Sequence, residues 1–158
     1  MIFTTSTGKQ FYLTDEQVSI RAKRMGTLNI PEWDAAQSVC HLYPSASDFG
    51  SRINLYGKMS NKTVSSFLSL KAVFPELEQA IKFLTENKVD VLYSYVFGAV
   101  KLAQSISANF SCVIVNGSIP TDDELNTIKN KLSRMVCTTY GISEVGVVSS
   151  GLADGGCV

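Results

Sequence analysis

The chain has 158 residues, of which 45% are hydrophobic and 18% charged, and its 14 basic and 14 acidic side chains leave no formal net charge. This composition excludes a disordered chain, and without a basic run the surface is not that of a nucleic-acid binder. The length fits one compact α/β domain over residues 1–158. No apolar stretch approaches the roughly 20 residues of a membrane-spanning helix, so no membrane span is expected.

The cysteines give no sign of a metal site or of a disulfide scaffold. Cys40, Cys112, Cys137 and Cys157 lack paired spacing, and three of them lie in apolar runs, where a free thiol behaves as a small hydrophobic side chain. The residues after Met1 have the pattern of a strand and a polar loop and not that of a signal peptide. The sequence therefore predicts a protein of the reducing cytoplasm.

The first segment combines a short strand with a loop rich in hydroxyl groups. Met1–Phe3 predicts the strand, and Thr4–Lys9 the loop, which ends in glycine and lysine. Loops of this kind cradle phosphates through backbone N–H groups, and a lysine adds positive charge. Thr14 and Gln17 then form a capping box, which predicts a helix to about Arg24. The alternative interpretation is a plain polar turn between strand and helix.

The next segment contains the only histidine of the chain. Residues 26–37 lack periodicity and are expected to form a connection with room for one helical turn, and Ser38–Tyr43 predicts a strand around His41. A lone histidine in an apolar strand is typical of a buried core residue. A histidine base or a multi-histidine metal site would have to be built around this residue alone.

From residue 63 onward, apolar runs alternate with amphipathic helices. Pro75 suits a first helical position, and Thr121 and Glu124 form a second capping box. Strands are expected at 63–70, 89–94, 112–115, 135–139 and 145–149, with helices at 75–87, 96–107 and from 121 to about 134. This alternation predicts a mainly parallel sheet with helices on both faces.

Three segments follow strands of this predicted sheet: Thr4–Lys9, Asn116–Ser118 and Tyr140–Glu144. In an open parallel sheet, ligands bind outside the carboxyl ends of the strands. We therefore expect the three segments to lie along one rim and to form a single nucleotide cradle.

The segment Tyr140–Glu144 has the side chains that a magnesium nucleotide needs. The Tyr140 ring can lie against a base, and Gly141 lets the backbone turn sharply at little steric cost. Ser143 can donate to a phosphate oxygen, and Glu144 offers the hard oxygen that Mg²⁺ prefers. The alternative interpretation is an ordinary loop with a surface tyrosine and glutamate.

These motifs resemble those of the adenylate-forming enzymes, which include acyl-CoA synthetases, luciferases and peptide-synthetase adenylation domains. Tyr140–Glu144 is similar to their Tyr-Gly-x-Thr-Glu motif, with Ser143 in place of threonine. The first loop resembles their Ser/Thr-Ser-Gly-Thr-Thr-Gly-x-Pro-Lys-Gly signature. It departs from that signature at Thr5, where the first glycine is usual, and at Gln10–Tyr12, which replaces Pro-Lys-Gly.

The resemblance implies a role for each matched residue. The triphosphate of ATP would be contacted by Thr4, Ser6, Thr7, Gly8 and Lys9. The turn of Asn116, Gly117 and Ser118 would border the adenine and the acyl group, and Tyr140 and Gly141 would hold the adenine. Ser143 and Glu144 would be catalytic, Ser143 at the phosphates and Glu144 as the Mg²⁺ ligand. Tyr95 and Phe49 lie near positions that line the acyl pocket of the family.

The activity implied is the joining of a carboxylate to ATP, which gives an acyl-adenylate and pyrophosphate, followed by transfer of the acyl group to coenzyme A or a carrier protein. The resemblance spans the chain but only the middle of the family. It implies a partial AMP-binding domain, without the C-terminal lysine-bearing domain and with little activity alone. The exposed sheet edges of such a part also predict self-association, for example as a homodimer.

Two other classes of function remain open from the sequence. The first is a catalytically inactive nucleotide- or acyl-binding regulatory module derived from the same family, which the altered first loop favours. The second is an unrelated α/β interaction domain of flavodoxin-like build, in which the motifs are coincidental.

Overall fold

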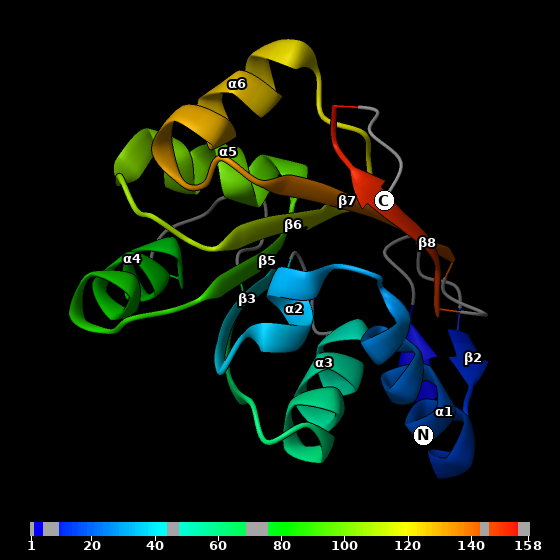
Figure 1. Ribbon diagram of the computed structural model, residues 1–158. Helices are drawn as coiled ribbons and strands as arrows, with labels where there is room; N and C mark the ends of the chain where they lie inside the picture. Colours follow the sequence, from blue (N-terminus) through cyan, green and yellow to red (C-terminus); the bar gives the residue numbers. More distant parts are fainter. Residues whose placement is uncertain (1, 5–9, 44–47, 69–75, 143–145, 155–158) are drawn as a thin grey trace.

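The main feature of the computed structural model is a six-stranded sheet in the order β4-β3-β5-β6-β7-β8 (Figure 1). The structure describes residues 2–4, 10–43, 48–68, 76–142 and 146–154. The sheet consists of β3 (Ser38–Tyr43), β4 (Thr63–Leu68), β5 (Val91–Tyr95), β6 (Cys112–Asn116), β7 (Val136–Ile142) and β8 (Gly146–Leu152). Neighbouring strands from β4 to β7 are parallel, and β8 pairs antiparallel with β7. The predicted mainly parallel α/β sheet is therefore confirmed.

Helices cover both faces of this sheet. They are α1 (Asp15–Arg24), the 3₁₀ helix η1 (Met25–Thr27), α2 (Pro31–Ala35), α3 (Asp48–Met59), α4 (Glu76–Glu86), α5 (Val96–Ser105) and α6 (Asp122–Lys131). The first four pack on one face and the last three on the other (Figure 1). None of the described helices is long and apolar enough to cross a membrane.

Burial on both faces explains the continuous apolar runs of the central strands. In β5, Val91 and Tyr93 face the core beneath α2 and α3, and Leu92 between them faces the core beneath α4 and α5. All three side chains are inaccessible to solvent. A strand covered on both faces has no polar alternation, and this is typical of parallel sheets between two helical layers.

Both predicted capping boxes are present. The Thr14 hydroxyl accepts from the Gln17 backbone N–H at 3.1 Å, and the Gln17 side-chain oxygen accepts from the Thr14 backbone N–H at 2.9 Å. Thr121 and Glu124 form the equivalent pair at the start of α6, with distances of 3.4 and 2.8 Å. Each pair satisfies two backbone donors that a helix start leaves without intrahelical partners.

Three segments differ from the sequence prediction. Residues 26–37, expected to be a connection with room for one helical turn, contain two short helices, α2 and most of η1, and α3 was not predicted at all. Gly57 lies inside α3, where glycine normally weakens a helix. A Cβ atom there would lie 2.4 Å from Val64 Cγ2, so glycine permits α3 to approach β4 closely. The third segment, the strand β2 (Gln10–Tyr12), pairs with β1 (Ile2–Thr4), where no strand was expected.

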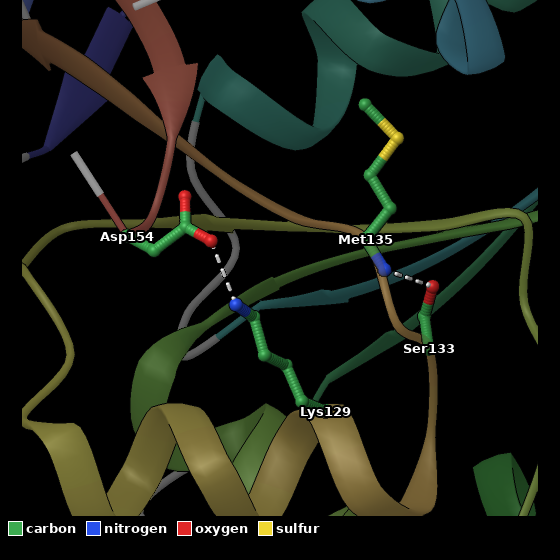
Figure 2. Close-up of polar contacts among 4 residues, drawn as sticks. All are labelled: Lys129, Ser133, Met135 and Asp154. Carbon is green, nitrogen blue, oxygen red and sulfur yellow. Dashed lines mark hydrogen bonds and ion pairs between the residues drawn. The ribbon is translucent and has the colours of Figure 1, made fainter. Parts of the chain in front are cut away.

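The outer strand β8 is tied to the helix layer at its end. Figure 2 shows Lys129 of α6 in an ion pair with Asp154, which follows β8; the Nζ–Oδ2 distance is 2.9 Å. Nearby, the Met135 backbone N–H donates to the Ser133 hydroxyl at 3.1 Å, just before β7 begins. Because Asp154 is half exposed, we expect its pair to add less than about 1 kcal/mol.

Asp90 joins the beginnings of β3 and β5. One oxygen of its carboxylate accepts from the backbone N–H groups of Gln37 and Ser38, at 2.8 and 3.0 Å, and from the Ser38 hydroxyl at 3.2 Å. Burial opposes ionisation of this carboxyl, but the hydrogen bonds from Gln37 and Ser38 and the charge of Lys88 together outweigh it and lower its pKa below 3.8. Asp90 is therefore ionised at neutral pH and binds two strand ends that are 52 residues apart in sequence.

Replacing Asp90 with alanine is expected to lower the free energy of unfolding by about 2 kcal/mol, because hydrogen bonds to a charged acceptor are lost. Urea denaturation at pH 7 measures this change. Asp90→Asn is the matched variant and should lose less, since it keeps an oxygen acceptor. A midpoint for Asp90→Ala equal to that of the unchanged protein would mean that the hydrogen bonds of the Asp90 carboxylate do not stabilise the fold.

Candidate functional site

The carboxyl ends of three adjacent strands bring predicted site residues together. Tyr95 at the end of β5 pairs with Asn116 at the end of β6, and Asn116 pairs with Thr139 of β7. Gly117 follows with φ of +87°, a conformation that favours glycine, and nothing lies within 4 Å of the position of a Cβ atom there. The described residues of two of the three predicted segments therefore meet at one edge of the sheet, and the backbone is open at Gly117.

Tyr140 lies at this edge with 64% of its surface exposed. Gly141 differs from the prediction of a sharp turn, because β7 continues to Ile142 and Gly141 pairs with Val147 of β8. A Cβ atom at Gly141 would lie 2.7 Å from the backbone oxygen of Gly146. Glycine is thus required by the close approach of β8, where the pairing register also shifts, and not by a turn.

Of the first predicted segment, only Thr4 lies among the described residues. Thr4 ends β1 and pairs with Gln10 of β2, so an additional strand, β2, precedes α1. Figure 1 places the β1–β2 pair at the end of the molecule where β8 begins. Ser6, Thr7, Gly8 and Lys9, like Ser143 and Glu144, lie outside the described residues, and their predicted roles remain predictions.

A buried polar group beside this edge was not predicted. The Tyr93 hydroxyl of β5 is 2.7 Å from the Thr139 hydroxyl of β7, and both side chains are buried. Burial raises the pKa of Tyr93 above its usual range, although the Thr139 hydrogen bond and the charge of Arg52 oppose this. The phenol therefore remains protonated and can share a hydrogen bond with Thr139. No local pattern predicts this hydrogen bond, because Tyr93 and Thr139 lie 46 positions apart in sequence, in apolar strands.

His41 is part of the same buried region. Its ring stacks on Tyr43 at 4.7 Å between centroids and meets the edge of Tyr93 at 5.9 Å. Burial lowers the pKa of His41 to about 3, so its imidazole is neutral at physiological pH. The predicted core histidine is confirmed.

Two buried arginines flank the first residue of β8. Arg52 of α3 and Arg21 of α1 are 3% and 8% exposed. A Cβ atom at Gly146 would lie 2.6 Å from Arg52 Nη1 and 3.8 Å from Arg21 Cγ. Gly146 also has φ of +94°, so this position requires glycine both for its backbone and for the space that the guanidinium occupies. The Arg52 guanidinium therefore places a permanent positive charge at the beginning of β8.

The described cysteines behave as core residues. Cys40, Cys112 and Cys137 are buried free thiols, and burial raises the pKa of Cys40 to about 12. The Cys112 thiol donates to the Cys137 sulfur at 3.8 Å, and this contact and burial raise the pKa of Cys112. Within the described ranges, no three His, Cys, Asp or Glu side chains gather where they could hold a metal ion.

A cavity of about 380 Å³ lies at the opposite end of the strands, where α4 and α5 end. Its lining residues are Leu84, Thr85, Asn87, Lys88, Val89, Ile106, Ser107, Ala108, Asn109 and Phe110. Lys88 is the only ionisable side chain among them, so this cavity has few groups for catalysis. The edge with Asn116 and Tyr140 therefore remains the better candidate site.

No protein-family model matches the chain, and it matches no curated protein. Solved structures do match it. An open conformation of 2-hydroxyisobutyryl-CoA ligase, in complex with 2-HIB-AMP and CoA, aligns with 97% of this chain and 36% of its own, at a TM-score of 0.74 and 11% identity. ATP-bound MatB from Rhodopseudomonas palustris has a TM-score of 0.68 and 15% identity, and the alignment covers 99% of this chain and 32% of the MatB chain.

The same fold occurs in the luciferase-like enzyme of the mealworm Zophobas morio, with a TM-score of 0.63, 15% identity, and coverage of 96% of this chain and 36% of that one. The chain has the fold of the central part of the adenylate-forming enzymes. It spans about a third of the length of these solved proteins. At this identity the likeness shows the adenylate-forming fold, and it agrees with the resemblance of the sequence motifs.

Proposed function

We propose that this chain is the nucleotide-binding core of a carboxylate-activating enzyme and binds ATP at the edge formed by β5, β6 and β7. The observation that carries the proposal is the strand register, which sets Tyr95, Asn116 and Thr139 side by side, with Tyr140 exposed beyond them. It is supported by the shared fold with MatB, whose solved structure holds ATP, and with a CoA ligase whose structure holds 2-HIB-AMP and CoA.

The described residues fit a nucleotide base better than they fit a catalytic acid or base. The exposed Tyr140 ring offers a stacking surface, and the open backbone at Gly117 allows a planar ligand to approach. The only histidine is buried and neutral. The proposed chemistry therefore relies on positioning ATP and a carboxylate, and on neutralising phosphate charge, more than on proton transfer.

The remaining roles come from the resemblance of the motifs. The triphosphate would be held by Thr4, Ser6, Thr7, Gly8 and Lys9, and Ser143 would donate to it. Glu144 would be a protein ligand of Mg²⁺, which often binds through only one or two carboxylates together with substrate phosphates. Bound Mg²⁺ would reduce the charge of the phosphates. The acyl acceptor would be coenzyme A or a carrier protein, in the cytoplasm.

Replacing Tyr140 with alanine is expected to weaken ATP binding roughly 5- to 150-fold, because stacking of a base on an aromatic ring contributes about 1–3 kcal/mol. Isothermal titration calorimetry with ATP and Mg²⁺ measures the change. Val148→Ala is the matched control, since Val148 is also exposed, at 58%, on the neighbouring strand β8. If Tyr140→Ala binds ATP as tightly as Val148→Ala, Tyr140 does not hold the base.

A second candidate, a binding module without catalysis, is favoured by the first loop. Gln10–Tyr12 replaces the usual Pro-Lys-Gly and forms the strand β2. The dependence of ATP binding on Mg²⁺ and on Glu144 separates the two candidates. Binding that requires Mg²⁺ and is lost in Glu144→Ala would support the core of an enzyme, and binding that ignores Mg²⁺ and survives Glu144→Ala would support the module. Because we expect little carboxylate-dependent exchange of pyrophosphate with ATP by the 158-residue polypeptide in either case, robust exchange would exclude the module.

A further inference from the structure

The Tyr93–Thr139 hydrogen bond joins two strands that are not neighbours in the sheet. β6 lies between β5 and β7, and the Tyr93 backbone pairs with Ile114 of β6. The phenol reaches past this strand to Thr139, two residues further along β7 than Cys137, the partner of Ile114. It is a side-chain link between β5 and β7 at their carboxyl ends, and it acts where backbone hydrogen bonds do not join them directly.

The Tyr93 ring packs against two other aromatic rings. Trp33 and His41 each meet it edge to face, at 5.8 and 5.9 Å between centroids. Tyr93 is fully buried and Thr139 is 6% exposed, so water does not compete for the hydrogen bond. A polar pair in a dry, packed environment fixes the distance between its two partners more strictly than an apolar contact does.

Such a pair adds little net stability. A phenylalanine and a valine would fill nearly the same volume, and replacing both partners of a buried hydrogen bond by apolar groups of the same shape can be nearly neutral. The hydroxyl of Thr139 therefore contributes little to the free energy of unfolding, and its main effect is to fix the position of β7 relative to Tyr93. Directly after it, Tyr140 is exposed, and the pairing of β7 with β8 shifts register between Tyr140 and Gly141. Because the strand pairing is irregular at Tyr140, the hydrogen bond that holds the adjacent Thr139 helps to fix the backbone position of Tyr140.

We propose that Tyr93 is a positioning residue of the nucleotide site: through the hydroxyl of Thr139 it fixes the end of β7 in the orientation that presents the Tyr140 ring to the base. Tyr93 does not touch the nucleotide and acts through Thr139. This inference rests on the proposed function, and it extends the site from the exposed edge into the core beneath it.

Substitutions at Thr139 separate geometry from packing. Thr139→Val keeps the branched shape and removes the hydroxyl, whereas Thr139→Ser keeps the hydroxyl and removes the methyl group. If packing alone mattered, the valine variant would bind ATP at least as well as the serine variant. The proposal expects the opposite order. Thr139→Ser should bind ATP about as tightly as the unchanged protein, and Thr139→Val should bind it more weakly by about fivefold or more, a loss within the interaction energies found between contacting residues.

A double-mutant cycle then tests whether Tyr93 acts through Thr139. Tyr93→Phe should weaken ATP binding about as much as Thr139→Val, and the double variant should lose no more than either single one. Tyr56→Phe is the matched control, because it removes another buried phenol hydroxyl from the same face of the sheet. Calorimetric titration with ATP and Mg²⁺ gives the affinities, and melting temperatures confirm that each variant is folded.

The outcomes are distinct. ATP binding that survives both Tyr93→Phe and Thr139→Val, or losses that add in the double variant, would overturn the inference while leaving the proposed function intact. An unchanged protein that does not bind ATP would overturn the proposed function, and this inference with it. If Tyr93→Phe does not fold, the order of the valine and serine variants at Thr139 still decides the question.

Discussion

Replacing Trp33 with alanine is expected to lower the free energy of unfolding by about 3–5 kcal/mol. Trp33 is fully buried beneath the sheet, where it stacks on Tyr56 at 5.3 Å and meets the edge of Tyr93 at 5.8 Å. Its indole N–H donates to the Met25 backbone oxygen at 2.8 Å. The substitution would leave a cavity and a buried acceptor without its donor. Because small domains are stable by only about 5–15 kcal/mol, this is a large fraction of the total.

Urea denaturation followed by far-ultraviolet circular dichroism measures this loss, since Trp33 is the only tryptophan and its fluorescence disappears with it. Trp33→Phe should lose less, because it keeps most of the ring packing and gives up the hydrogen bond. Tyr12→Ala, at a side chain that is 74% exposed, is the surface control and should change stability by less than about 0.5 kcal/mol. Equal midpoints for Trp33→Ala and Tyr12→Ala would show that Trp33 does not support the core.

The sequence predicted those parts of the fold that depend on neighbouring residues. Both capping boxes are local patterns, and each marks the beginning of a helix in the structure. The apolar runs likewise predicted the central strands. No helix was predicted over α3, and the approach of Val64 from β4, which explains the glycine at position 57, depends on tertiary packing and leaves no local pattern. Trp33 was placed in a connection for a similar reason, since its partners Tyr56 and Tyr93 are distant in sequence.

The sequence predicted the exposed residues of the candidate site but not the buried residues beneath them. Asn116 and Tyr140 follow apolar strands, and ligands of parallel sheets gather at such ends, so a general rule sufficed to bring them together. The extension of β7 through Gly141 depends on pairing with β8, which no local pattern announces. Arg52 and Tyr93 carry no local signal either, because their burial follows from how α3 lies on the sheet.

Mild acid is expected to weaken the fold through His41. The pKa of this imidazole is lowered to about 3 in the folded protein by burial, against 6.5 for the unperturbed group. The unfolded chain therefore binds a proton below pH 6.5 that the folded protein does not. The contribution of the neutral His41 side chain to the free energy of unfolding is fully present above that pH. It is lost as the pH falls toward 3, by about 1.4 kcal/mol per pH unit. Between pH 7 and pH 5 the free energy of unfolding should fall by about 2 kcal/mol.

His41→Gln is the decisive variant, because the chain has no other histidine. The substitution can change absolute stability, so the quantity to compare is the slope of the free energy of unfolding against pH, from urea denaturation at pH 7, 6 and 5. The unchanged protein should show the loss, and the variant should be nearly flat. Asp90 does not interfere, since its pKa lies below 3.8 and its contribution is lost only at more acidic pH. Equal slopes in the two proteins would mean that His41 is accessible to protons in the fold, contrary to its burial against Tyr43 and Tyr93.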